Sequence, residues 1–151
     1  MNKLLQIPCT HCRSLNRVPN TRLTDRPICG HCHAPLFTGQ PFVLTTDNFE
    51  LHASRSDIPL VVDFWAAWCG PCQVMAPAYH KAAKMLEPEV RAGKINSDEE
   101  RSLAARFEIV SIPTLIIFRE GRELGRKPGI METHEIVRWV RSFADSNYKS
   151  D

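Results

Sequence analysis

The chain has 151 residues, of which 43% are hydrophobic and 24% charged, and its formal net charge is +2. These values exclude wholesale disorder, and the length suits one domain, or one small domain with an appendage. No apolar run approaches the ~18 residues that a membrane helix needs, and the N-terminus lacks the apolar core of a signal peptide. We therefore expect no membrane partner and a cytoplasmic location.

Residues 1–40 form a basic segment that is rich in proline, glycine and asparagine. They contain one acidic residue, Asp25, and five basic residues: Lys3, Arg13, Arg17, Arg22 and Arg26. The remaining 111 residues carry a small acidic excess, and this asymmetry predicts two modules, 1–40 and 41–151. Because aromatic residues are not interleaved with the basic ones, the composition argues against nucleic acid as a partner.

All six cysteines fall in C-x-x-C pairs, and two of the pairs lie in the basic segment. Cys9 and Cys12 are separated from Cys29 and Cys32 by 16 residues, which is within the spacing window of a four-cysteine zinc site. Each pair can present two thiolates from one tight turn, and two turns complete a tetrahedron around Zn²⁺. In a reducing compartment this pattern predicts metal binding ahead of structural disulfides.

A structural zinc site also answers a folding problem. Forty residues with few apolar side chains cannot bury a self-sufficient core, and zinc binding worth roughly 10–16 kcal/mol can supply the missing free energy. Two alternatives to this ligand set remain: the pairs could be redox or disulfide pairs, or one of His11, His31 and His33 could replace a cysteine as a ligand. A bound zinc ion could be structural or redox-responsive, because zinc-bound thiolates can be oxidised with loss of the metal.

The body of the chain reads, in order, β-α-β-α-β-α-β-β-α, which fits an α/β fold with an antiparallel hairpin at one edge of its sheet. The expected strands cover residues 41–44, 59–64, 90–95, 114–118 and 123–127. The expected helices cover residues 48–54, 69–86, 99–107 and 133–143. Within the second helix, Val74 and Met85 are counted among the packing residues, and His52 in the first helix is assigned to the surface.

The third cysteine pair, Cys69 and Cys72, lies where the buried strand 59–64 meets the long helix. A cysteine at a helix N-terminus feels the positive end of the helix dipole, which favours the reactive thiolate. Cys72 is one turn further on, within reach to resolve a mixed disulfide, and Pro71 is tolerated in the first turn. A redox-active pair is the prediction, and a structural disulfide is the alternative.

Two further features lie near this pair in the expected fold. Asp63 is an acid inside the otherwise apolar strand, where burial would raise the pKa of its carboxyl and let it take the proton of Cys72 through a water. The alternative is an acid at the strand edge that faces solvent. Pro113 precedes a strand, and a cis bond there would turn the Ile112 backbone outward toward a bound peptide.

Residues 59–129 resemble the thioredoxin family, and the resemblance extends over about 41–145. Residues 61–72, VVDFWAAWCGPC, match the active-site signature of the family almost residue by residue, with Ala67 as a departure where many members carry a charge. Pro77 matches the helix-kinking proline, and Ile112-Pro113-Thr114 the cis-proline loop. The segment before residue 41 is similar to that of the zinc-carrying bacterial members, the thioredoxin 2 type.

The resemblance implies a thioredoxin fold, a central mixed sheet flanked by helices, with a small N-terminal four-cysteine zinc module. It also implies a protein disulfide reductase that is recharged by an NADPH-dependent thioredoxin reductase and binds no organic cofactor. Cys69 would attack, Cys72 resolve, and Asp63 act as the base with Lys94 tuning it. The expected substrate platform consists of Trp68, Gly70, Pro71, Ile112, Pro113 and Gly129.

The expected substrates are disulfide-containing cytosolic proteins, the expected setting includes the response to oxidative stress, and a monomer is expected. Two other function classes fit parts of the sequence. A disulfide oxidant or isomerase of the same fold would act in an oxidising compartment, and a measured redox potential would separate it from a reductase. A zinc-dependent binding module would lose its partner on zinc removal while keeping reductase activity.

Overall fold

The computed structural model describes residues 3–149, with side chains as far as Phe143. Its larger part is a five-stranded sheet with strand order β3-β5-β4-β6-β7. The strands are β3 (Phe42–Val43), β4 (Leu60–Trp65), β5 (Arg91–Asn96), β6 (Thr114–Arg119) and β7 (Arg122–Pro128). β4 pairs in parallel with β5 and antiparallel with β6, so the sheet is mixed.

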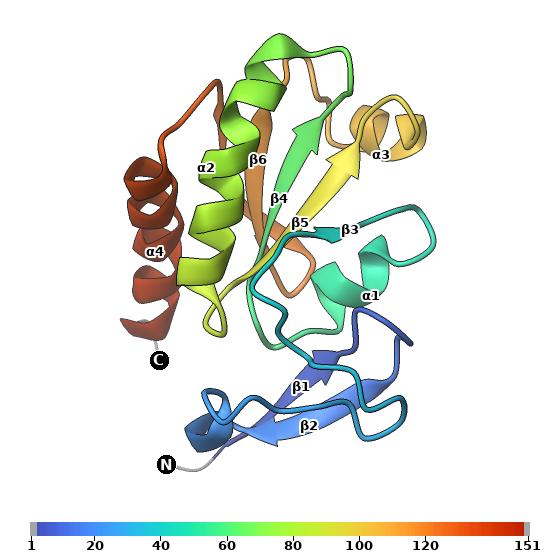
Figure 1. The fold of residues 1–151 in the computed structure, drawn as a ribbon, viewed down its shortest axis with the longest axis vertical. Coiled ribbons are helices and arrows are strands. Elements are labelled where there is room, and N and C mark those ends of the chain that lie inside the picture. Colours follow the sequence, from blue (N-terminus) through green and yellow to red (C-terminus); the bar gives the residue numbers. More distant parts are fainter. Residues whose placement is uncertain (1–2, 150–151) are drawn as a thin grey trace.

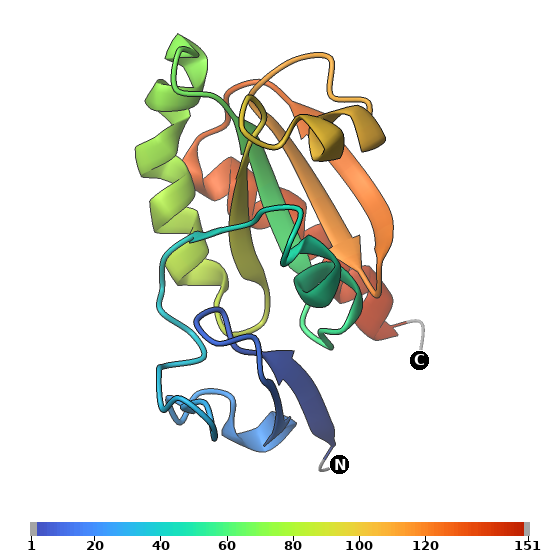
Figure 2. The same ribbon diagram turned by 90° about the vertical axis from the view of Figure 1, so that its right-hand side faces the viewer.

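Helices cover both faces of this sheet (Figures 1 and 2). They are α1 (Phe49–Ser54), α2 (Gly70–Leu86), α3 (Arg101–Arg106) and α4 (Thr133–Lys149). Successive side chains of a strand point to opposite faces, and β4 follows this rule. Val61 packs in the cluster that contains the apolar faces of α2 and α4, whereas Leu60 and Val62 pack with residues of α1 and α3.

The alternation of β4 places Asp63 on the same face as Val61, toward α2. Asp63 is also directly opposite Lys94 in the parallel β4–β5 register. Strand pairing therefore brings an acid and a base, 31 positions apart in the sequence, to one place beneath the helix that starts at the Cys69–Cys72 pair.

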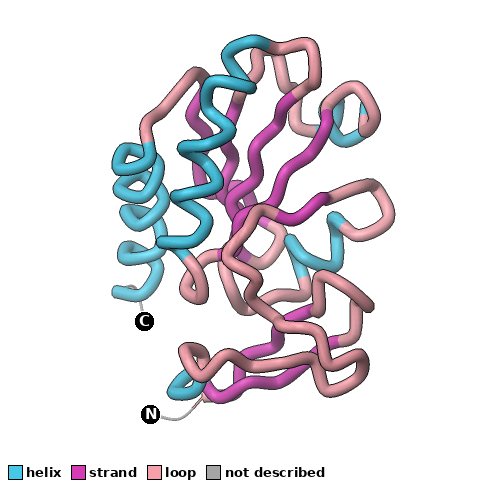
Figure 3. Tube along the Cα trace, viewed as in Figure 1, coloured by secondary structure: helices cyan, strands magenta, loops and turns pink. Residues whose placement is uncertain are grey.

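The N-terminal segment folds as a separate small unit (Figure 3). It contains an antiparallel pair of strands, β1 (Leu4–Pro8) and β2 (Leu15–Pro19), followed by a single 3₁₀ turn, η1 (Asn20–Arg22). Its buried residues include Ile7, Val18 and Leu36, and they pack against Ile58 of the body. Within residues 3–149, these two strands do not pair with the five-stranded sheet.

One buried arginine connects the two units. Arg91, at the start of β5, donates from Nη1 to the carbonyl of Pro8 at 2.7 Å and from Nη2 to the carbonyl of Leu36 at 2.6 Å. Its guanidinium also lies over the rings of Phe37 and Phe42, 5.3 and 5.7 Å from their centroids. The contact is buried, with Arg91 2% exposed.

The expected element order is confirmed, and each expected strand and helix overlaps an observed one. The strands of the N-terminal segment were not predicted, because its turn-forming residues obscure two short extended runs. Three expectations about burial were wrong: Val74 and Met85 were expected to pack, and His52 was expected at the surface. Val74 and Met85 are 67% and 42% exposed, because α2 turns only one side toward the sheet. His52 is 2% exposed, with its ring edge against Phe42.

In the part of the chain that the structure describes, we find no helix with the length and apolar character to cross a membrane.

Candidate functional site

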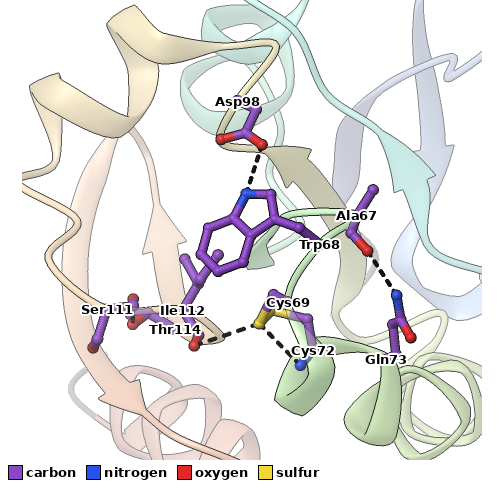
Figure 4. Close-up of a disulfide and its surroundings, with 9 residues drawn as sticks. All are labelled: Ala67, Trp68, Cys69, Cys72, Gln73, Asp98, Ser111, Ile112 and Thr114. Atoms are coloured by element: carbon purple, nitrogen blue, oxygen red, sulfur yellow. Dashed lines mark hydrogen bonds between the residues drawn. A yellow bond between two sulfur atoms is a disulfide. The ribbon is translucent and has the colours of Figure 1, made fainter.

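Cys69 and Cys72 form a disulfide at the N-terminus of α2, with their Cα atoms 5.3 Å apart (Figure 4). Cys69 is the N-cap residue of α2, and its sulfur accepts a hydrogen bond from the backbone N–H of Cys72 at 3.2 Å. Gly70 and Pro71 fill the first turn, where the missing N–H of proline costs nothing. After reduction, this N–H and the helix dipole would both stabilise a Cys69 thiolate.

An exposed indole borders the disulfide, and side-chain hydrogen bonds hold the loop around it in place. Trp68 is 71% exposed, and its indole Nε1 donates to Asp98 Oδ2 at 2.8 Å. On the other side, Gln73 Nε2 donates to the carbonyl of Ala67 at 2.6 Å. Figure 4 shows the indole beside the disulfide, with Asp98 on its far side. The two bonds fix the loop that leads into Cys69.

A proline loop faces the disulfide from the β6 side. The Ile112–Pro113 peptide bond is cis, and the Ile112 carbonyl oxygen lies 3.7 Å from the sulfur of Cys69. Gly129 donates its N–H to the carbonyl of Pro113 at 2.9 Å, so a third segment joins this face. Gly129 has φ of 95°, and a Cβ there would meet no atom within 4 Å. Glycine is thus required by backbone conformation, and the space beside it is open.

Asp63 lies beneath the pair and is 6% exposed. Among the described residues its Oδ1 atom has no hydrogen-bond partner. Burial raises the pKa of the Asp63 carboxyl to about 7, and the charge of Lys94 opposes that rise. The two residues share a cavity of about 110 Å³ with Cys72. A cavity of this size has room for water, so a proton can pass between Cys72 and Asp63 without direct contact.

The four remaining cysteines lie together in the N-terminal unit, with all their sulfur atoms within 4.8 Å of one another. Two of the sulfur–sulfur distances are 3.7 Å, for Cys9 and Cys32, and 3.6 Å, for Cys12 and Cys29. Four sulfurs at ~2.3 Å from a tetrahedral Zn²⁺ are about 3.8 Å apart. The donor set therefore fits zinc.

Backbone N–H groups point at these sulfurs in both turns. Cys9 Sγ accepts from His11 and Cys12 at 3.3 and 3.5 Å, and Cys29 Sγ accepts from His31 and Cys32 at the same two distances. The N–H of Cys32 is the largest of several hydrogen bonds that lower the pKa of the Cys29 thiol. This environment suits thiolate ligands. His11, His31 and His33 are all exposed, outside the sulfur cluster.

Sequence reasoning missed several residues that shape these sites. Asp98, Gln73, Tyr79 and Asn16 carry no motif, and each matters through a contact that only the fold creates. Tyr79, for example, is buried under the sheet and its hydroxyl lies 2.7 Å from the carbonyl of Gly93. The one available signal for Tyr79 was its polar hydroxyl on an otherwise apolar helix face, and this signal does not show which group the hydroxyl contacts.

The Cys69–Cys72 disulfide lies at the N-terminus of the helix that follows the central strand of a mixed five-stranded sheet, and a cis-proline loop faces it. This arrangement defines a thiol–disulfide oxidoreductase of the thioredoxin fold. The chain belongs to the thioredoxin family. The family model described as "Thioredoxin" matches residues 40–142. A zinc-ribbon model described as "Thioredoxin 2, N-terminal" matches residues 8–34, the segment that contains all four clustered cysteines.

Several known proteins are similar to this chain. Thioredoxin C-3 of Corynebacterium nephridii is 40% identical over 134 residues, which cover 89% of this chain and 92% of that protein. The thioredoxin of Rickettsia bellii is 34% identical over 99 residues, 66% of this chain and 94% of its own. Thioredoxin 1 of a Nostoc species is 41% identical over 81 residues, 54% of this chain and 76% of its own.

Proposed function

We propose that this chain is a protein disulfide reductase whose Cys69–Cys72 pair cycles between dithiol and disulfide. The observation that carries the proposal is the position of the pair. Cys69 caps a helix and faces the Ile112 carbonyl, while Cys72 shares a cavity with the buried Asp63 carboxyl. One cysteine is thus placed for attack, and the other is placed next to a base.

In the first step, the Cys69 thiolate attacks one sulfur of a substrate disulfide, forms a mixed disulfide and releases one substrate thiolate. In the second step, Asp63 accepts the proton of Cys72 through water in the cavity, and the Cys72 thiolate attacks the sulfur of Cys69. This breaks the mixed disulfide and releases the second substrate thiolate. Two electrons have passed to the substrate, and the chain holds the Cys69–Cys72 disulfide.

Lys94 assists the second step because its charge stabilises ionised Asp63. The exposed indole of Trp68, the first turn at Gly70 and Pro71, the Ile112–Pro113 loop and the open side of Gly129 form the proposed docking surface for substrates. A thioredoxin reductase using NADPH would return the disulfide to the dithiol. We propose disulfide-containing proteins of the cytoplasm as substrates, a role in the response to oxidative stress, and a monomeric state.

The same proposal assigns residues 1–40 to a zinc module and residues 41–151 to a thioredoxin domain. When bound, the zinc ion would cross-link the two cysteine turns and supply folding free energy that the small core lacks. Cys9, Cys12, Cys29 and Cys32 would hold it as four thiolates. Four protein ligands leave no open position, so the ion is structural in this proposal and the redox chemistry stays with Cys69 and Cys72.

Serine substitutions test the two cysteine roles separately. We expect Cys69→Ser to abolish reduction of insulin disulfides, since no other thiol is placed to attack. Cys72→Ser should still attack but should accumulate a mixed disulfide with the substrate, visible as a covalent adduct on a non-reducing gel. Turnover by Cys69→Ser would contradict the proposed mechanism.

A further inference from the structure

The side-chain amide of Asn16 lies between the two cysteine turns of the zinc module. Asn16 is half-buried on β2, directly opposite Ile7. Its Oδ1 accepts the backbone N–H of Gly30 at 2.8 Å. Its Nδ2 lies 3.6 Å from Cys29 Sγ, 3.2 Å from the carbonyl of Ser14 and 3.5 Å from the carbonyl of Ile7. Because the Gly30 N–H can only donate, it requires the oxygen of the amide, which turns the NH₂ group toward the sulfur.

Asn16 makes two otherwise matching turns unequal. Cys9 and Cys29 each accept two backbone N–H bonds of matching lengths from their own turn. Cys29 alone of these two accepts a third donor, and that donor comes from the other half of the module. Asn16 follows Cys12 by four residues on the first half of the module, yet it holds both the Gly30 backbone and the Cys29 sulfur of the second half.

Groups of this kind orient metal ligands and stabilise their charge. Four thiolates around Zn²⁺ leave a net charge of −2, which N–H donors offset, and loss of such an outer contact typically costs about 10–100-fold in metal affinity. We infer that Asn16 is a positioning residue of the metal site, which fixes the Cys29 turn against the Cys9–Cys12 half and stabilises the Cys29 thiolate. The inference rests on the proposed zinc site and concerns how firmly that site holds its ion.

Asn16→Asp tests the inference with the smallest change of shape. Aspartate keeps an oxygen for the Gly30 N–H, but it replaces the N–H donor next to Cys29 with a second, negatively charged oxygen. Asn48→Asp is the matched control. Asn48 bridges main-chain groups in the same way, accepting from Thr45 at 2.7 Å and donating to the Val43 carbonyl at 3.1 Å, but neither of these contacts involves a sulfur atom.

The measurement is the rate at which the full-length, zinc-loaded protein transfers its ion to a chromogenic chelator. We expect Asn16→Asp to release zinc about tenfold faster than the unsubstituted protein or more, and Asn48→Asp to match the unsubstituted protein. Equal release rates for Asn16→Asp and the unsubstituted protein would overturn the inference.

A second measurement needs no substitution and therefore does not depend on the folding of a variant. With ¹¹³Cd in place of zinc, a hydrogen bond to a ligating sulfur transmits a scalar coupling between the metal and the donor proton. We expect such a coupling at the Asn16 side-chain amide as well as at the backbone N–H groups of the two turns. Couplings at the backbone groups without one at Asn16 would refute the inference. A chain that binds neither metal would instead contradict the proposed zinc site itself.

Discussion

At the scale of single residues, Asp63 is a buried carboxyl whose ionisation opposes folding. Its pKa is raised from 3.8 to about 7, first by burial. Below both values the carboxyl is protonated in the folded and the unfolded chain. As pH rises between them, the unfolded chain loses the proton first, so the free energy of unfolding falls with pH. Above pH 7 the full penalty applies, on the order of 4 kcal/mol at about 1.36 kcal/mol per pKa unit.

Asp63→Asn removes that penalty because the amide does not titrate. We expect the disulfide form of Asp63→Asn to exceed the unsubstituted protein in free energy of unfolding by a few kcal/mol at pH 8, and by less at pH 5. Urea unfolding at both values measures the difference. Asp47→Asn, at an exposed carboxyl, controls for charge and should follow the unsubstituted protein. A stability difference that does not depend on pH would show that Asp63 ionises normally in the folded chain.

Lys94 acts on the same carboxyl in the opposite direction, since its charge lowers the pKa of Asp63. Replacing Lys94 with methionine should therefore raise that pKa further. In the proposed mechanism the second step needs ionised Asp63, so we expect that step to reach half its maximum rate at a higher pH in Lys94→Met. Stopped-flow measurement of substrate thiol release from the mixed disulfide gives this profile. Lys81→Met is the control, because Lys81 is exposed on α2 and does not line the cavity of Asp63. It should leave the pH profile unchanged. An unchanged profile in Lys94→Met as well would contradict the proposed effect of Lys94 on Asp63.

The residues of the site divide by how far sequence could locate them. Cys69, Cys72 and Asp63 are conspicuous in the sequence. The two cysteines form a C-x-x-C pair where the buried strand meets the long helix, and Asp63 is an acid within an otherwise apolar strand. Asp98 and Asn16 have no such local signal, because each contributes to its site through a contact with a residue at least 13 positions away. A single sequence carries no record of such contacts. Sequence therefore predicts the proposed reacting groups better than the groups that hold them in place.

At the scale of elements, periodicity predicted the strands and helices of the body because each has one consistently apolar side or is apolar throughout. It was least informative where an element owes its position to another. β3, expected over residues 41–44, is two residues long because only Phe42 and Val43 pair with Gly93 and Lys94 of β5. β1 and β2 likewise stabilise each other, with a core completed by Ile58 of the body. The extent of β3 and the existence of β1 and β2 depend on tertiary contacts that no local pattern encodes.

The packing of β5 provides a prediction at this scale. A Cβ added at Gly93 would lie 2.5 Å from Cδ1 of Leu44, a side chain that is itself fully buried. We expect Gly93→Ala to lower the free energy of unfolding by about 1–3 kcal/mol through overpacking, measured by urea denaturation. Gly70→Ala is the control for stability, because a Cβ there meets nothing within 4 Å. Equal unfolding midpoints for the two variants would show that Leu44 repacks without cost.

At the scale of the whole molecule, the question is whether the two sheets unfold as one unit. Arg91 starts the strand that carries Lys94, and its guanidinium caps two carbonyls of the zinc module, one of them adjacent to Cys9. Burial lowers the pKa of Arg91 to about 10, so the group stays charged at neutral pH. A buried charge whose hydrogen-bond acceptors belong to another module joins their stabilities, because separating the modules leaves donors and acceptors unpaired.

Two probes can follow the modules separately, since all three tryptophans lie beyond residue 64 and the four clustered cysteines lie before residue 33. In the unsubstituted zinc-loaded protein we expect tryptophan fluorescence and zinc release to report one urea transition. Arg91→Ala leaves two buried carbonyls unpaired and a cavity beside Phe37 and Phe42. It should lower the free energy of unfolding by about 2–5 kcal/mol and make zinc release precede the fluorescence change. Separate transitions already in the unsubstituted protein would mean that the modules are independent, and that Arg91 joins their surfaces without joining their stabilities.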